Sequence, residues 1–284
     1  MVGLILIGET RRMKSIKVAI VHNQEKKTLE VLPILMALLK ENQIEVEGKH
    51  PEVVISIGGD GTLLSAFHRF SHRLNEVRFL GIHTGHLGFY TDWRDYELEE
   101  MVKTLTQLKE TKEVIAYPLL DVLIQYRDPK EATRHFLALN ESVIRRIGKT
   151  MVADVYIEDE FFESFRGDGL ALSTPTGSTA YNKSIGGAVI HPKVSAFQLT
   201  EIASLNNIVF RTLGSPLIIG KSCWVTIYPK PADDYFITVD QLDLPHHKDI
   251  EKVVYRIAEE KIQFVPTRHT PFFTRVKDAF IGGK

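Results

Sequence analysis

The chain of 284 residues contains a single cysteine, Cys223, so it cannot form an internal disulfide bond. Cys223 adjoins Trp224 in an apolar stretch, and we predict a buried packing role for it. No apolar run is long enough to cross a membrane. The apolar opening, residues 1–8, is too short and lacks the basic residues and the cleavage site of a secretory signal. These absences indicate a cytoplasmic protein.

An excess of charge of one sign is also missing. Lys and Arg number 35 and Asp and Glu number 36, which gives a net charge of −1, and the signs are mixed along the chain. The basic field that nucleic acid or an anionic membrane surface would require is therefore absent. We expect small-molecule partners, with no nucleic acid and no membrane among them. The length and the 44% of hydrophobic residues suit a globular protein of two domains.

Two familiar nucleotide-binding signatures are lacking. There is no G-x-G-x-x-G, and Gly220-Lys221-Ser222 resembles only the end of a P-loop. Apolar residues and Pro216 precede it, where a P-loop needs free backbone N–H groups, so we predict a β turn. His83 and His86 have a spacing that can bind metal, but no cysteine or third histidine is close in sequence. We interpret them as ordinary loop histidines and predict no metal site built from protein ligands.

The most informative stretch that is present is residues 53–63. Val53–Ile57 is an uninterrupted apolar run typical of a buried parallel strand, and apolar residues at helical spacing follow from Leu63 to Phe70. The turn between them is Gly58-Gly59-Asp60-Gly61-Thr62. Its glycines expose the backbone, and the start of the helix offers unpaired N–H groups and the positive end of a dipole. The turn therefore predicts a phosphate-binding loop formed by Gly58, Gly59, Gly61 and Thr62.

Asp60 is an anion placed in a turn that favours phosphate, so it needs a separate explanation. One is chemical: the carboxylate could accept a proton from a substrate hydroxyl or contact a metal ion. The alternative is structural: Asp60 could cap the helix through the N–H of Thr62. The turn alone does not decide between the two.

The first half of the chain alternates strand and helix. We predict strands over 16–21, 53–57 and 77–82, and helices from Leu29 to Leu39, from the glycine turn to Phe70, and over 93–109. This alternation indicates a doubly wound parallel sheet. The glycine loops 58–61 and 83–88 both follow strands, so they should line one crevice at the carboxyl ends of the sheet.

From about Tyr117 the pattern changes to a mainly β domain. Predicted strands are 119–126, 136–144, 152–157, 224–228, 236–239 and 253–257, and predicted helices are 177–184 and 194–203. A helical tail within 271–284 should pack back on the first domain. We therefore predict an α/β nucleotide domain over 1–116, with 1–12 as a possible extension, and a β-rich domain over 117–270. The active site is expected in the crevice between them.

Two polar stretches in the second half are candidate ligand sites. Asn140-Glu141 interrupts an apolar strand pattern, and by itself a satisfied pair at a sheet edge explains it better than a ligand contact. Residues 166–184 combine hydroxyls, a second Gly-Asp-Gly and a lysine. This density suits a polar pocket in which Ser178 or Thr179 caps a short helix that projects Tyr181, Asn182 and Lys183. A hydroxyl-rich surface loop is the alternative.

Taken together and in this order, the motifs resemble those of the NAD kinases, the ATP/polyphosphate-NAD kinase family, in its bacterial type. They are Gly58-Gly59-Asp60-Gly61-Thr62, Asn140-Glu141, Arg166-Gly167-Asp168-Gly169 and Thr174-Pro175-Thr176-Gly177-Ser178-Thr179-Ala180-Tyr181. The resemblance covers nearly the whole chain. Gly-Gly-Asp-Gly-Thr also occurs in diacylglycerol and sphingosine kinases and, in a close form, in phosphofructokinases. The Thr174–Tyr181 stretch is what favours NAD.

The resemblance implies transfer of the terminal phosphate of ATP, or of polyphosphate in some members, to the 2′-hydroxyl of the adenosine ribose of NAD. Asp60 would be the general base, with Mg²⁺ as the divalent cation that accompanies ATP. The implied NAD-binding residues are Asp60, Gly61, Asn140, Glu141, Arg166, Asp168, Thr179, Ala180, Tyr181, Asn182, Lys183, Ser184, Ala203 and Gln241. A homodimer or homotetramer is also implied.

Two positions depart from the family pattern. His83 stands where an asparagine is common, which leaves its role open, and Asp240-Gln241 stands where Asp-Gly-Gln is usual. Two rival hypotheses remain at this stage. A lipid kinase would share the glycine turn but would need an apolar membrane-facing surface. A non-catalytic NAD sensor would have no need of Asp60.

Overall fold

The computed structural model describes residues 16–85, 87–108, 113–232, 234–245, 249–266 and 270–282. The predicted extension 1–12 and His86 lie outside these ranges. Within them, no helix is both long enough and apolar enough to span a bilayer.

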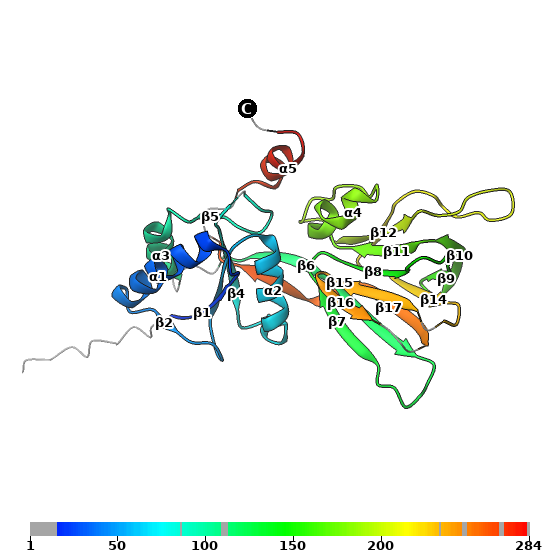
Figure 1. Cartoon of the computed structure of the whole chain (residues 1–284), viewed down its shortest axis with the longest axis horizontal. Coiled ribbons are helices and arrows are strands. Elements are labelled where there is room, and N and C mark those ends of the chain that lie inside the picture. Colours follow the sequence, from blue (N-terminus) through cyan, green and yellow to red (C-terminus); the bar gives the residue numbers. More distant parts are fainter. Residues whose placement is uncertain are drawn as a thin grey trace, which may run out of the picture.

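The first half forms the predicted doubly wound layer. Strands β4 (Arg78–His83), β3 (Val53–Ile57), β1 (Lys17–His22) and β2 (Glu45–Val46) lie in this order and are parallel. Val54 and Ile55 face opposite sides of the sheet and belong to separate hydrophobic clusters. Helices α1 (Lys26–Glu41) and α3 (Leu98–Gln107) cover one face, and α2 (Asp60–Phe70) covers the other (Figure 1). A short 3₁₀ turn, η1 (Ser71–Arg73), follows α2.

The helix predicted over 93–109 begins later than expected. Trp93 and Arg94 form β5, which pairs in parallel with the end of β4, and the helix starts only at Leu98. Trp93 is buried in the α1 and α3 cluster, so burial and pairing with β4 override the helical pattern at this end.

The second half is mainly β, as predicted. Its strands are β6 (Ile115–Tyr126), β7 (Arg134–Ala138), β8 (Glu141–Arg146), β9 (Met151–Ile157), β10 (Glu160–Gly167), β11 (Gly169–Ser173), β12 (Ala196–Ile202), β13 (Leu217–Gly220), β14 (Trp224–Pro229), β15 (Tyr235–Val239), β16 (Leu242–Pro245) and β17 (Ile250–Phe264). Strands β13-β12-β11-β8-β15-β16 form one antiparallel sheet. The others continue the first sheet, because β17 pairs with β6 and β14 and its last residue reaches β4. One core fills the space between the two sheets.

Two predictions about this half were wrong in detail. Residues 136–144 form two strands in different sheets, and the chain crosses between the sheets at Leu139 and Asn140. Residues 194–203 form β12 rather than a helix. Phe197 and Leu199 enter the core between the sheets, and the alternate residue Gln198 bonds Ala188, so the period is two.

Two smaller predictions had mixed outcomes. The turn predicted at 220–222 is present, since the N–H of Cys223 donates to the Gly220 carbonyl oxygen at 3.1 Å. Cys223 itself is only half-buried, at the margin of the core, because it follows that exposed turn.

The final helix, α5 (Phe272–Phe280), lies above the junction of the two halves (Figure 1). Phe89, in the loop that follows β4, contacts Phe272 and Phe280 with ring centroids 6.3 and 5.8 Å apart. On its other side α5 meets His191, whose ring lies 5.2 Å from that of Phe272. The helix therefore bridges the α/β layer and the segment that precedes β12.

Candidate active site

The glycine loop begins at the carboxyl end of β3. Gly58 has a φ of +147°, which side chains rarely allow, and its N–H donates to the Ile82 carbonyl oxygen at 2.9 Å. A Cβ at this position would lie 2.3 Å from the Thr62 hydroxyl oxygen and 2.8 Å from the Asn23 amide nitrogen. Only glycine fits, and the ends of β1, β3 and β4 thereby meet at this point.

Helix α2 starts directly after this loop, with Gly59 as its N-cap residue and Asp60 as its first residue. No side chain caps the helix, and the Thr62 N–H donates to the Gly59 carbonyl oxygen at 3.0 Å. The alternative in which Asp60 caps the helix through Thr62 is therefore wrong. A Cβ added at Gly59 would meet no described atom within 4 Å, and one at Gly61 would have its nearest neighbour at 3.8 Å. The backbone of this turn is thus open on the side that the two glycines face.

The Asp60 carboxylate is held by the loop that follows β4. Its two oxygens accept hydrogen bonds from the backbone N–H groups of Phe89 at 2.8 Å and Tyr90 at 3.0 Å. The loop approaches so closely that a Cβ on Gly88 would lie 2.2 Å from the nearer oxygen. Position 88 therefore requires glycine, and the carboxylate has one fixed orientation.

Burial raises the pKa of Asp60, and this effect outweighs the two backbone hydrogen bonds and the positive charge of Arg275, all of which lower it. A carboxylate with a raised pKa is a better proton acceptor than an exposed one. Asp60 therefore combines fixed geometry with increased basicity, which is the combination a general base needs.

Asn140 directly precedes an internal strand that Glu141 begins. Glu141 begins β8, which pairs with β11 and β15 in the middle of the six-stranded sheet, so the interpretation as a sheet-edge pair is wrong. The Asn140 side-chain oxygen accepts a hydrogen bond from the hydroxyl of Tyr90. Because Tyr90 also donates its N–H to Asp60, the two sequence motifs share one loop as a common support.

Glu141 is a buried carboxyl with an unusual pKa. Burial, followed by the nearby charge of Asp240, raises its pKa from 4.5 to about 8. Its Oε2 has no hydrogen-bond partner among the described residues. At neutral pH the ligand-free protein therefore holds a neutral carboxyl, which can donate as well as accept a hydrogen bond.

We expect Glu141 to make stability depend on pH. Its folded-state pKa lies above its unfolded value, so its contribution is complete below about pH 4.5 and is lost as the pH rises towards 8. Glu141→Gln stays neutral, so the melting temperature of this variant minus that of the wild type should increase from about pH 5 to about pH 8. Thermal unfolding without ligand measures this difference. The exposed Glu259→Gln is the matched control, and a constant difference for Glu141→Gln would contradict the assignment.

Asp240, for which no sequence pattern predicts a role, has a fully buried side chain. Its carboxylate accepts hydrogen bonds from the N–H groups of Leu139 at 2.9 Å, Asn140 at 2.7 Å and Glu141 at 3.2 Å. Asp240 therefore holds the backbone that presents Asn140 and Glu141. Its position between two predicted strands suggests a turn residue, and the match of Asp240-Gln241 to Asp-Gly-Gln points to the glutamine rather than to a buried aspartate anchor.

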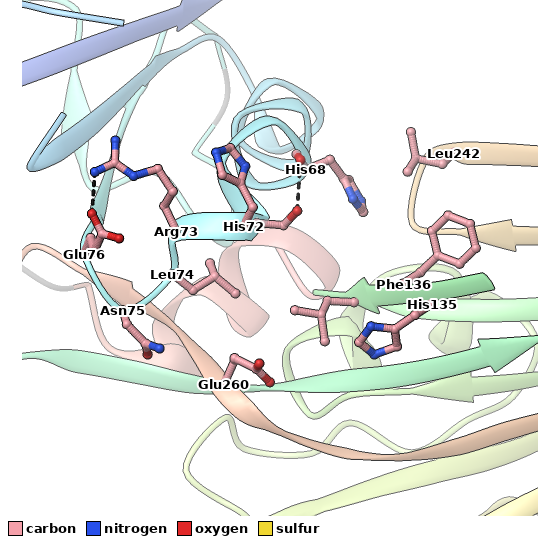
Figure 2. Close-up of a pocket in the computed structure, with 12 residues that line it drawn as sticks. His68, His72, Arg73, Leu74, Asn75, Glu76, His135, Phe136, Leu242 and Glu260 are labelled. Atoms are coloured by element: carbon pink, nitrogen blue, oxygen red, sulfur yellow. Dashed lines mark hydrogen bonds and ion pairs between the residues drawn. The ribbon is translucent and has the colours of Figure 1, made fainter. Parts of the chain in front are cut away.

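Asp240 also contacts His68, a residue that lines a cavity. Its Oδ2 lies 2.8 Å from Nε2 of His68 on α2. His68 lines a pocket of about 480 Å³ together with His72, His135 and Glu260, which come from η1, β7 and β17 (Figure 2). None of the predicted site residues lines this pocket, so it is separate from the glycine loop.

The hydroxyls of residues 174–179 turn inward. The Thr174 and Thr176 hydroxyls donate to the Leu139 carbonyl oxygen at 2.6 and 3.0 Å, and a Cβ on Gly177 would lie 2.0 Å from the Asn140 carbonyl oxygen. This stretch, which includes η3 (Thr176–Thr179), is buried, so the surface-loop alternative is wrong. Its hydroxyl density serves to dock it against the chain that carries Asn140.

The short helix α4 (Tyr181–Ser184) follows, as predicted, but it is not capped by Ser178 or Thr179. The Ser178 hydroxyl accepts from the Ile190 N–H at 2.8 Å and donates to the Pro175 carbonyl oxygen. Within α4 the Asn182 side chain is fully buried and accepts from Thr200 at 2.8 Å, whereas Tyr181 is 37% exposed. A side chain can reach a ligand more readily from Tyr181 than from Asn182.

Comparison with known proteins assigns the family. The model of the ATP-NAD kinase N-terminal domain matches residues 10–114, and that of the C-terminal domain matches residues 139–266. The chain belongs to the ATP-NAD kinase family. It is 64% identical over 266 residues to the NAD kinase of Enterococcus faecalis, covering 94% of this chain and 99% of that one. It is 54% identical over 268 residues to the NAD kinase of Lacticaseibacillus paracasei, with the same coverage.

Solved structures agree at the level of the fold. The yeast NADH kinase complexed with NADH has a TM-score of 0.80 at 21% identity, covering 95% of this chain and 89% of that one. An NAD kinase from Archaeoglobus fulgidus in complex with ATP has a TM-score of 0.72 at 22% identity, with coverage of 92% and 99%.

As an NAD kinase, the chain phosphorylates NAD to NADP with ATP, and the lipid kinase and NAD sensor hypotheses fall away.

The remaining residues implied by the NAD kinase resemblance lie in two places. Arg166, Asp168 and Ala203 meet where β10 and β11 join the end of β12, and the Asp168 N–H donates to the Ile202 carbonyl oxygen at 2.9 Å. The Arg166 guanidinium lies over the ring of Phe210 at 4.3 Å. Asp168 lines a pocket of about 520 Å³ that Tyr181 also lines. The structure thus brings Asp168 and Tyr181 together beside the sheet that carries Glu141.

Gln241 lies instead against the first turn of α2. With its amide nitrogen facing Gly61, it donates to the Gly61 carbonyl oxygen at 3.0 Å and accepts from the Ser65 hydroxyl at 2.6 Å. It is exposed and lies within one turn of Asp60. This NAD kinase lacks the glycine of the usual Asp-Gly-Gln. Its glutamine, Gln241, nevertheless lies beside the glycine turn.

His83, which replaces the usual asparagine of NAD kinases, is 4% exposed. Its Nδ1 lies 3.0 Å from the Gly85 carbonyl oxygen, and its Nε2 has no hydrogen-bond partner among the described residues. The side chain is packed at the end of β4, beside the glycine turn.

Proposed function

We propose that Asp60 is the general base of this NAD kinase and accepts the proton of the 2′-hydroxyl of the adenosine ribose of NAD. The observation that carries the proposal is a buried carboxylate, fixed by two backbone N–H groups, at the start of a helix whose glycine turn is open. Phosphoryl transfer depends on positioning and charge neutralisation more than on covalent chemistry. The preoriented carboxylate serves positioning, and the positive end of the α2 dipole at the phosphate-binding turn offsets part of the phosphate charge.

The proposed phosphate cradle is Gly58, Gly59, Gly61 and Thr62 at the start of α2. The helix dipole and the accessible backbone at Gly59 and Gly61 support it. We propose that the divalent cation, Mg²⁺, arrives with ATP as part of that substrate. The described residues contain no cluster of three or more His, Cys, Asp or Glu placed to hold a metal. Mg²⁺ often uses substrate phosphates and few protein ligands, which is the basis of this proposal.

The adenosine part of NAD is proposed to bind at Asn140 and Glu141. The unpartnered Oε2 of Glu141 and the raised pKa of its carboxyl support a hydrogen bond to the nucleoside. The remaining proposed NAD contacts are Gly61, Arg166, Asp168, Thr179, Ala180, Tyr181, Asn182, Lys183, Ser184, Ala203 and Gln241.

The proposed domain division, at about residues 116 and 117, places the two parts of the site on either side of a crevice, with α5 returning to the first domain.

We also propose a cytoplasmic homodimer or homotetramer. Ile208 and Val209 are 92% and 78% exposed, and apolar side chains so exposed support contact with a second copy of the chain.

The test is a steady-state assay of NADP formation from NAD, ATP and Mg²⁺, with NAD and ATP varied separately. Asn140→Ala should raise the KM for NAD by about 10-fold or more, because it removes hydrogen bonds to the bound nucleoside. The KM for ATP should not change. Asn75→Ala, an exposed residue of the cavity in Figure 2, is the matched control. A rise confined to the KM for ATP would place Asn140 in the donor site instead.

A further inference from the structure

Arg275 in α5 is a charged residue with only 3% of its surface exposed. Its guanidinium donates to the carbonyl oxygens of Gly88 and of Thr91, the latter at 3.0 Å, and it pairs with the carboxylate of Asp92. Its Nε also donates to the Thr270 carbonyl oxygen at 3.3 Å. The planar guanidinium thus binds the backbone and one side chain of the loop of residues 88–92, in addition to its contact with Thr270.

The same loop holds the catalytic carboxylate. The Phe89 and Tyr90 N–H groups that bind Asp60 lie between the two carbonyl groups that Arg275 binds. The Gly88 carbonyl group and the Phe89 N–H belong to one planar peptide group, so a rotation that turned this carbonyl away from Arg275 would also shift the N–H that faces Asp60. Position 88 leaves little room for adjustment, because even a Cβ added there would lie 2.2 Å from a carboxylate oxygen of Asp60.

We propose that Arg275 is a positioning residue for the phosphoryl transfer: by fixing the backbone of residues 88–92, it holds the two N–H groups that orient Asp60. The inference rests on the proposed role of Asp60. It also gives α5 a function beyond packing, since this helix is remote in sequence from both the glycine turn and the Asn140-Glu141 motif.

The packing of α5 indicates that this helix is a rigid support for the loop of residues 88–92 and not a loose tail. Phe89 of the loop contacts Phe272 and Phe280. The ammonium group of Lys183, in the proposed NAD site, lies 4.3 Å from the centre of the Phe280 ring. The helix therefore touches both the loop that orients the base and the helix that carries proposed NAD contacts.

Arg275 acts on Asp60 electrostatically as well. The titratable and charged groups that face Asp60 are His83 at the end of β4, Tyr90 on the loop and Arg275 on α5. The positive charge of Arg275 lowers the pKa of Asp60, against the larger effect of burial. Removing this charge should therefore raise the pKa of Asp60, whereas a lysine at the same position should largely preserve it.

Two variants separate geometry from charge. Arg275→Met removes the donors and the charge, and Arg275→Lys keeps the charge but loses the planar set of donors. We expect kcat to fall by about 100-fold in Arg275→Met and by about 10-fold in Arg275→Lys, because small displacements of a catalytic group have effects of this order. The acid limb of the pH profile of kcat/KM should move to higher pH in Arg275→Met only. Arg256→Met, which removes an exposed arginine of β17 that pairs with Asp121 on β6, is the matched control.

Thermal unfolding and NAD binding measured on the same samples establish that each variant is folded. Wild-type kcat in Arg275→Lys would overturn the proposal, whether or not Arg275→Met folds. An equal fall in kcat in both variants with no shift of the acid limb would also overturn it, because that is the result of a merely structural role. If Asp60→Asn retained turnover, the proposed function itself would fail. An inactive Asp60→Asn beside a fully active Arg275→Met would refute only the present inference.

Discussion

Asp60→Asn is expected to lose nearly all turnover while keeping its fold and most of its affinity for NAD. The variant removes the proton acceptor, and general-base catalysis is typically worth about 10²–10⁴-fold in rate. The side chain keeps its size, so the loop at Phe89 and Tyr90 can still close over it. One of the two backbone N–H groups will face the new amide NH₂ instead of an acceptor, so we expect a small loss of stability as well.

The measurement is kcat by NADP formation, with NAD affinity determined by calorimetry and folding by thermal unfolding. Asp154→Asn is the matched control, because Asp154 is a carboxylate on β9 that pairs with Lys230 away from the glycine turn. Turnover at the wild-type level in Asp60→Asn would remove Asp60 from the mechanism. A loss of NAD binding equal to the loss of kcat would assign it a binding role in place of a chemical one.

Local sequence patterns were enough to predict those elements whose structure is set by residues close to one another in the sequence. An apolar strand, a glycine turn and a helical repeat follow one another within the eighteen residues 53–70, and each feature depends on residues close in sequence. The doubly wound sheet follows from the same kind of alternation. Residues 194–203 illustrate the limit, because their apolar spacing suited a helix and only the position between β11 and β13 makes them a strand.

The residues that support the site were not predictable in this way. Asp240 bonds the Asn140 N–H across 100 positions of sequence, and Arg275 bonds the Gly88 carbonyl group across 187. A single sequence carries no signal for such a pairing, because an aspartate in a turn and an arginine in an amphipathic helix are both ordinary surface residues. Their burial arises only when the sheets and α5 assemble.

The hydroxyls of 174–179 show a related limit. Their density indicates an unusual polar segment, but composition does not reveal the direction in which the hydroxyls point. In the structure the Thr174 and Thr176 hydroxyls bind the Leu139 carbonyl group. The segment therefore supports the site through its backbone, and the side chains left to meet a ligand are the exposed ones of α4.

Asp240→Ala is expected to destabilise the protein by about 3–5 kcal/mol, which is the usual cost of removing one partner from a buried, hydrogen-bonded charge. The substitution leaves the N–H groups of Leu139, Asn140 and Glu141 without their acceptor and deprives His68 of its contact. The φ of +52° at this position adds a further cost for alanine. In a protein of this size the melting temperature should fall by roughly 10 °C.

A kinetic effect should accompany the loss of stability, because the released backbone carries the proposed NAD contacts Asn140 and Glu141. The KM for NAD should rise more than the KM for ATP in the fraction that remains folded at low temperature.

Asp240→Asn keeps one oxygen as an acceptor and tolerates the positive φ, so it should show a smaller loss of stability. The matched control is Asp234→Ala, which breaks partly exposed pairs with Arg146 and Lys149 and should cost much less stability. Equal losses in Asp240→Ala and Asp234→Ala would mean that Asp240 is a turn residue and does not anchor the chain that presents Asn140 and Glu141.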